Sequence, residues 1–222
     1  MGRDDVAESV RGLYDNGPQE ISGEPLRVIS FHLGGSSSVT GIRNGVAIGT
    51  SMGFSPQSGL PQNNRVGDLD SGALPYASKA LGITMEEAER QLTKESGLQG
   101  VSGVSNDLRD ICDAAESGNN DAQLALDMLI DSARHWASSY LFELGGLDTI
   151  VFTAGIGENN PWLRTAICAG LENFGVIIDE EKNAACMASE AVISSDNSQV
   201  KVAVIPANEE LVLAREVHRK IS

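Results

Sequence analysis

The stretch from Asp148 to Pro161, DTIVFTAGIGENNP, decides the fold class. Its first six residues form a short apolar run that is typical of a buried strand. The run leads into a turn with glycines at Gly155 and Gly157, and Pro161 suits the first turn of a helix. The free N–H groups at such a helix start favour the phosphates or the sugar of a nucleotide. A tight strand-to-helix turn without a ligand is the alternative interpretation.

The same stretch argues against two common nucleotide motifs. Asn160 occupies the place of the third glycine in GxGxxG, and GxxxxGK[ST] occurs nowhere in the sequence. A Rossmann dinucleotide-binding fold and a P-loop NTPase therefore both lose support.

Strands and helices alternate on both sides of this stretch. Asn44-Gly45 lies between two β-type runs and predicts a hairpin, because both residues tolerate positive φ. Strands are expected at 26–31, 39–42, 46–49, 148–153, 176–178, 192–194 and 200–205, and helices at 73–81, from Thr84, from Ser105, at 120–144, from Pro161 and at 207–221. This mixture predicts an α/β layered fold over 25–222 that follows an irregular segment at 1–24.

The composition and net charge of the chain argue against some classes of binding partner. The chain has 222 residues and a net charge of −15, which argues against nucleic acid or an anionic membrane as the main partner. No apolar run approaches the length of a membrane span, and the first residues have no secretory h-region. Three widely spaced cysteines suggest neither a disulfide framework nor a zinc site, and a reducing cytoplasm fits best.

Three further segments are candidate sites. In the segment His32–Ser38, HLGGSSS, Gly34, Gly35 and Ser36 could form an anion-binding nest, or only a hairpin turn. Arg65, near two aspartates, could bind a transferring phosphoryl group or make a surface ion pair. Glu209, near the start of the last helix, could hold Mg²⁺ through water or serve the helix dipole alone.

The order of the segments is more specific than any one of them. HLGGSSS, TSMGFSPQSGL, RVGDLD, SGVSNDLRD, VFTAGIGEN and IPANEEL together resemble the acetate kinase (acetokinase) family, from about Leu26 to about Arg219. The resemblance implies a fold of the actin, hexokinase and sugar-kinase type, which is ribonuclease H-like. It also implies reversible phosphoryl transfer from ATP to a short carboxylate such as acetate or propionate, with Mg²⁺ and pairing of two copies.

The resemblance also implies roles for individual residues. Arg65 resembles the arginine that stabilises the transferring phosphoryl group, with His32 as a second catalytic candidate, and Glu209 resembles the carboxylate that helps to hold Mg²⁺. The residues implied for nucleotide binding are Gly34, Gly35, Ser36, Asp107, Leu108, Arg109, Gly155, Ile156 and Asn159.

Two departures from the family pattern lie near these residues. The family loop usually reads HLGNGSS, where this chain has Gly35 and Ser36, and the stretch usually written GLMMGTRSGD reads GLPQNNRVGD here. The family chain is also nearly twice this length, so the sequence resembles its C-terminal, nucleotide-binding half. Two hypotheses follow: the nucleotide half of an ATP-dependent carboxylate kinase, or a catalytically silent nucleotide-binding or dimerisation module.

Overall fold

The computed structural model describes residues 26–221, except for the side chains of Glu209, Val212 and Glu216. The irregular segment expected at 1–24 lies outside these residues. The described chain divides into two compact units. We call residues 26–33, 40–49 and 139–221 the sheet unit, and residues 34–39 and 50–138 the helical unit.

A six-stranded mixed sheet in the order β3-β2-β1-β4-β6-β5 confirms the predicted α/β class. The strands are β1 (Arg27–Leu33), β2 (Ser37–Arg43), β3 (Val46–Thr50), β4 (Thr149–Thr153), β5 (Ala191–Val192) and β6 (Lys201–Val204). β1 and β4 run parallel, as do β4 and β6, whereas β5 is antiparallel to β6. The central β4 is buried at all five residues, which explains why its sequence is a continuous apolar run rather than an alternating one.

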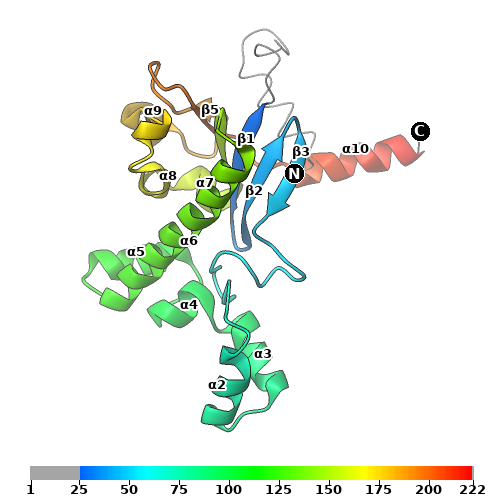
Figure 1. The fold of residues 1–222 in the computed structure, drawn as a ribbon, viewed down its shortest axis with the longest axis vertical. Helices are drawn as coiled ribbons and strands as arrows, with labels where there is room; N and C mark the ends of the chain where they lie inside the picture. Colours follow the sequence, from blue (N-terminus) through cyan, green and yellow to red (C-terminus); the bar gives the residue numbers. More distant parts are fainter. Residues whose placement is uncertain (1–25, 222) are drawn as a thin grey trace. The chain divides into compact units, whose positions relative to one another are not determined.

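The predicted hairpin joins β2 and β3 (Figure 1). Its turn residues Asn44 and Gly45 have φ of 52° and 77°, as the Asn-Gly pair predicts. The ring of Tyr140 packs so closely on this hairpin that a Cβ added at Gly41 or at Gly49 would lie 2.8 Å from a ring carbon. Burial raises the pKa of Tyr140 to about 12.

The helices largely follow the expected pattern. They are α2 (Ala73–Leu81), α3 (Met85–Lys94), α4 (Gly97–Ser102), α5 (Leu108–Glu116), α6 (Asn120–Leu144), α7 (Ala154–Asn159), α8 (Pro161–Cys168), the 3-10 helix η1 (Glu172–Phe174), α9 (Glu180–Ala185) and α10 (Glu209–Ile221). Within the helical unit, α2 and α3 lie side by side (Figure 1). Thr84 caps α3 by accepting a hydrogen bond from the backbone N–H of Glu87 at 3.1 Å.

Two local predictions differ from the structure, and two short helices were not predicted. The glycine turn at 154–160 is the short helix α7, which ends before Pro161, the first residue of α8. The expected strand at 176–178 makes only isolated bridges, from Val176 to Val200 and from Ile178 to Ser194. The helices α4 and α9 were not predicted, because each has only six residues and no extended apolar periodicity.

Within the described residues, no helix is long and apolar enough to cross a bilayer.

Candidate functional site

The carboxyl ends of three parallel strands meet at one edge of the sheet unit. His32, near the end of β1, pairs in register with Thr153, the last residue of β4. Phe152 of β4 pairs with Val204, the last residue of β6. Ligands of open α/β sheets bind outside such carboxyl ends. The predicted residues of this unit are thereby brought to one edge, because α7 follows β4 and the segment leading to α10 follows β6.

The chain turns sharply between β4 and α7. Ala154 has a left-handed φ of 67°, a conformation that costs a residue with a side chain about 1–2 kcal/mol. Gly155 comes next and is exposed, and a Cβ built on it would meet no atom within 4 Å. Neither packing nor backbone conformation within the described protein therefore requires glycine at this position.

Side chains donate to four consecutive carbonyl groups near the end of α7, where a helix leaves carbonyls without intrahelical partners. Asn159 Nδ2 donates to the carbonyl of Gly155 at 2.9 Å, and Asn160 Nδ2 donates to that of Ile156 at 2.8 Å. Arg164 Nη1 donates to the carbonyls of the next two residues, Gly157 and Glu158, at 2.8 and 2.9 Å. The predicted residue Asn159 thus has a structural role in addition to any contact with a ligand.

Arg164 is a fully buried arginine whose guanidinium pairs with none of the carboxylates that the structure describes. Its Nε donates to Asn183 Oδ1 at 2.8 Å, and its Nη2 donates to the carbonyls of Asn183 and Cys186 at 2.9 and 2.8 Å. All five N–H donors are therefore used. Burial lowers the pKa of this guanidinium.

Glu158 links α7 to the segment before α10. Its side chain is buried, and Oε1 accepts a hydrogen bond from the backbone N–H of Ala207 at 2.9 Å. Two residues later, Glu209 begins α10, and Asn208 Oδ1 accepts from the N–H of Leu211 at 3.1 Å. The start of α10 is thus tied to the end of α7.

In the helical unit, Arg65 lies in a loop whose two ends, Gly59 and Asp68, are hydrogen-bonded to each other. The backbone N–H of Asp68 donates to the carbonyl of Gly59 at 2.9 Å, and the N–H of Gly59 donates to Asp68 Oδ1 at 2.8 Å. Trp136 Nε1 donates to the other carboxylate oxygen of Asp68 at 3.1 Å. This aspartate therefore supports the loop and makes no ion pair with Arg65.

The N-terminus of α4 braces the middle of the same loop. The N–H groups of Leu98 and Gln99 donate to the carbonyls of Gln62 and Asn63 at 2.8 and 2.9 Å. Gly97 has φ of 62°, and a Cβ there would collide with the carbonyl oxygens of Gln62 and Arg65. This position requires glycine, because both the backbone conformation and the close approach exclude a side chain.

Among the residues that the structure describes, the guanidinium of Arg65 has two partners, and both are neutral. Nη1 donates to Ser36 Oγ at 3.2 Å and to Gln62 Oε1 at 3.1 Å. The structure thereby brings Ser36 of the HLGGSSS segment to Arg65. Next to Ser36, a Cβ built on Gly35 would meet nothing within 4 Å, which leaves open space on this turn as at Gly155.

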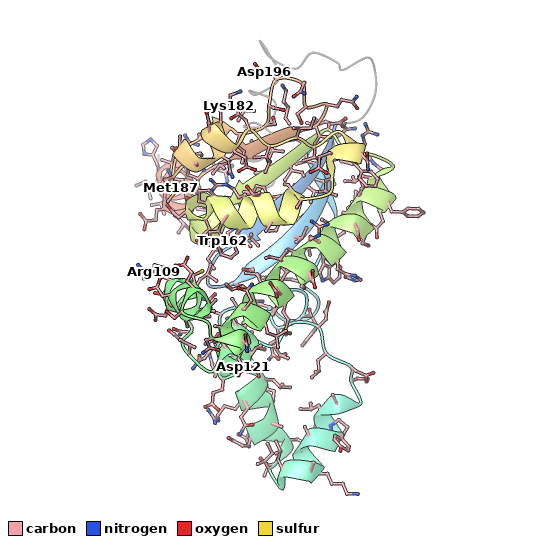
Figure 2. All side chains as sticks on the ribbon, turned by 90° about the vertical axis from the view of Figure 1, so that its left-hand side faces the viewer. Arg109, Asp121, Trp162, Lys182, Met187 and Asp196 are labelled. Carbon is pink, nitrogen blue, oxygen red and sulfur yellow. The ribbon has the colours of Figure 1, made fainter. Side chains whose placement is uncertain are left out.

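The predicted residues 107–109 lie at the start of α5 and make no hydrogen bond to Arg65. Asp107 is the N-cap and accepts from the backbone N–H of Arg109 at 2.9 Å, and its carboxylate pairs with the Arg109 guanidinium at 2.5 Å. Arg109 lies at the exposed surface of α5 (Figure 2). The side-chain hydrogen bond from Arg109, with its backbone N–H, lowers the pKa of Asp107 to about 2. Leu108 is buried, so only its backbone is available to a ligand.

Three residues of these regions were not predicted from the sequence: Gln62, Glu158 and Arg164. For Arg164 a signal existed, because its neighbours Leu163, Ile167 and Cys168 place it on the buried face of α8. Gln62 and Glu158 act through contacts with segments distant in the sequence and carry no local signal. Within residues 26–221, no group of three His, Cys, Asp or Glu side chains could hold a metal by itself.

The fold and the strand-end turns define the protein class as α/β, with the mixed sheet and flanking helices of the actin and hexokinase type. The chain belongs to the acetokinase family, whose profile matches residues 19–215.

Similar proteins cover most of this chain. It is 46% identical to propionate kinase PduW of Salmonella typhimurium over 87% of this chain and 47% of that protein. It is 44% identical to the acetate kinase of Heliobacterium modesticaldum over 88% of this chain and 49% of that protein. The crystal structure of Porphyromonas gingivalis acetate kinase matches with a TM-score of 0.86 at 35% identity, over 97% of this chain and 53% of that one. The chain thus spans about half the length of the relatives it matches.

Proposed function

We propose that this chain supplies the nucleotide side of an ATP-dependent phosphotransferase that acts on a short carboxylate such as acetate or propionate. In this proposal the chain binds ATP or ADP, and transfer yields an acyl phosphate. The names of the relatives, acetate kinase and propionate kinase, support the reaction class.

The observation that carries the proposal is the unneutralised charge of Arg65. Three other arginines of the described chain pair with carboxylates, Arg27 with Asp148, Arg90 with Glu87, and Arg109 with Asp107, whereas Arg43 and Arg164 donate to backbone carbonyls. Arg65 instead meets only a hydroxyl and an amide oxygen. Phosphoryl transfer depends mainly on positioning and on stabilising charge at the phosphoryl oxygens, for which an uncommitted guanidinium is suited.

Open space at two glycines supports nucleotide binding. Gly35 and Gly155 have neither a left-handed backbone nor a neighbour that a Cβ would meet. A ligand that approaches the backbone closely would account for glycine at both positions, as at the phosphate-binding turns of other folds. His32, Ile156 and Asn159 accompany Gly155 at the same edge of the sheet, and we assign them to the nucleotide side.

The donor set is compatible with Mg²⁺ that enters together with the nucleotide. Mg²⁺ in kinases keeps several waters and is bound by one or two carboxylates and the substrate phosphates, so a protein cage of three ligands is not needed. Glu209, the first residue of α10, is the carboxylate we assign to it. When bound, Mg²⁺ neutralises charge on the β- and γ-phosphates. We keep cytoplasmic location and pairing of two copies as proposals by analogy with the family.

Calorimetry with Mg-ADP tests the proposal. We expect the 222-residue chain to bind, and Gly155→Ala to weaken binding by about tenfold with an unchanged melting temperature, because the added methyl would occupy ligand space only. Gly82→Ala is the control for affinity, since its Cβ also meets nothing and it lies at the end of α2, far in the sequence from both turns. Its left-handed φ of 67° should lower the melting temperature of this variant, but nucleotide affinity should stay unchanged. No heat and no thermal shift with the wild-type chain would contradict the proposal.

A coupled assay separates the two hypotheses for this chain. We expect phosphorylation of acetate by these residues alone to be very weak or absent, because they span about half the length of their relatives. Ordinary turnover would exclude the silent module, whereas nucleotide binding without turnover would favour it for this chain in isolation.

A further inference from the structure

Gln62 is a buried polar side chain beside the arginine of the helical unit. Its relative exposure is 1%, although it lies in an irregular loop. A buried amide must satisfy both its oxygen and its nitrogen, since a buried polar group without a partner destabilises the fold. The two partners of this amide therefore indicate what the residue does.

Those two partners fix the orientation of the amide. Nε2 donates to the carbonyl of Pro56 at 2.5 Å, and Oε1 accepts from Arg65 Nη1 at 3.1 Å. Only the nitrogen can donate to a carbonyl and only the oxygen can accept from a guanidinium, so chemistry allows one orientation alone. The backbone of Gln62 is held as well, by its own N–H to the Arg65 carbonyl at 3.0 Å and by the Leu98 N–H.

Ser36 supplies the second acceptor, so that both hydrogens of Nη1 are used. Within residues 26–221, Nε and Nη2 of Arg65 donate no hydrogen bond, and no carboxylate pairs with it. A carboxylate in place of either acceptor would hold the guanidinium equally well but would neutralise it. The neutral acceptors hold Nη1 of the guanidinium without cancelling its charge, so that Nε and Nη2 remain able to bind an anion.

We infer that Gln62, together with Ser36, is a positioning residue that orients Arg65 toward the terminal phosphate of the nucleotide. The identity of the anion rests on the proposed function, whereas the orientation of Arg65 is independent of it. Gln62 and Ser36 thus supply the two oxygen acceptors of one guanidinium nitrogen.

Nucleotide selectivity tests the inference. In the full 222-residue chain, calorimetry would compare Mg-ADP with the Mg²⁺ complex of a non-hydrolysable ATP analogue. We expect Gln62→Met to lower the affinity for the triphosphate about fivefold with little change for the diphosphate, because the guanidinium loses one of the two hydrogen bonds that orient it. Gln62→Glu should lower it further, by about tenfold or more, because a carboxylate neutralises Arg65 and repels phosphate.

The matched control is Gln57→Met in the same loop region. Gln57 is half-buried and donates to Thr93 Oγ1 at 2.7 Å, but it does not contact Arg65. This variant should leave the ratio of triphosphate to diphosphate affinity unchanged. An equal change in Gln57→Met and Gln62→Met, or an unchanged ratio in both Gln62 variants, would overturn the inference.

A measurement without nucleotide separates this inference from the proposed function. We expect NMR of the labelled free chain to show slow rotation of the Arg65 guanidinium, with rotation faster in Ser36→Ala and in Gln62→Met. Fast rotation in the wild-type chain overturns the positioning role. A restrained guanidinium in a chain that binds neither nucleotide supports the positioning role and contradicts the proposed function instead.

Discussion

Two arginines in different units of this protein show opposite uses of the same side chain. Arg164 is fully buried in the sheet unit, and its five donors bind two carbonyls of α7, the side-chain oxygen and carbonyl of Asn183 in α9, and the carbonyl of Cys186 just after α9. Arg65 in the helical unit is half-buried, and only its Nη1 is engaged. Neither one pairs with a carboxylate, so the difference lies in how many donors remain.

The number of remaining donors indicates the role. A guanidinium with every donor satisfied by carbonyls is a structural link, and its removal leaves buried acceptors without partners. A guanidinium held along one edge can bind an anion at no further cost in side-chain order. The same substitution should therefore cost more stability at Arg164 than at Arg65, and should affect nucleotide binding at Arg65.

Replacement of each arginine by methionine tests the comparison most directly. Arg164→Met should lower the free energy of unfolding by about 3 kcal/mol or more, because four backbone carbonyls and Asn183 Oδ1 lose their donor. Arg65→Met should lower it by about 1 kcal/mol and should reduce nucleotide affinity. Urea unfolding measures the two free energies of unfolding, and calorimetry measures the change in nucleotide affinity.

Equal destabilisation by the two substitutions would break the comparison. If Arg164→Met does not fold, Arg164→Lys keeps the charge and up to three donors and should lie between the wild type and the methionine variant.

A pair of glycines tests how α4 holds the loop that carries Arg65. Gly97 and Gly103 flank α4 with nearly equal φ, 62° and 65°, but only Gly97 faces the carbonyls of Gln62 and Arg65. Gly103→Ala should cost about 1 kcal/mol for backbone strain alone. Gly97→Ala should cost about 1–3 kcal/mol more, because the loop must move away from α4.

Thermal unfolding of both alanine variants, together with Mg-ATP affinity, checks this expectation. Equal melting temperatures would show that the close approach of α4 does not hold the loop.

The sequence predicts regular elements well where local signals are strong. The Asn44-Gly45 hairpin, the Thr84 cap and the full extent of α6 are confirmed. Each depends on residues that are near one another in the chain. The order of the motifs also identified the family correctly.

What the sequence did not predict depends on contacts between distant segments. α4 begins at a left-handed glycine, and loop carbonyls rather than a side-chain cap take its first N–H groups. Gln62 becomes a partner of Arg65 only because Pro56 fixes its amide. The isolated bridge of Val176 replaces a strand, because this segment pairs at one residue with Val200 rather than along a ladder.

Arg109, a third arginine, gives the smallest expected effect on stability. Arg109 is exposed and pairs with Asp107, so its charge is neutralised in the way that Arg65 avoids. The pKa of Asp107 is lowered from 3.8 to about 2, chiefly by the side-chain hydrogen bond from Arg109. A carboxyl with a lowered folded-state pKa stabilises the fold fully above its unfolded-state pKa, and this stabilisation is lost as the pH falls from about 4 toward 2.

An NMR titration of the Asp107 carboxyl carbon measures this pKa directly. Arg109→Gln should move the midpoint back toward 3.8, although the backbone N–H of residue 109 still donates to Asp107 and keeps it somewhat lower. Stability at pH 7 should change little, because the pair is exposed and screened by solvent. A midpoint that stays near 2 in Arg109→Gln would show that the N-cap hydrogen bond, rather than the ion pair, lowers the pKa. The guanidinium of Arg109 would then be as available to an anion as that of Arg65.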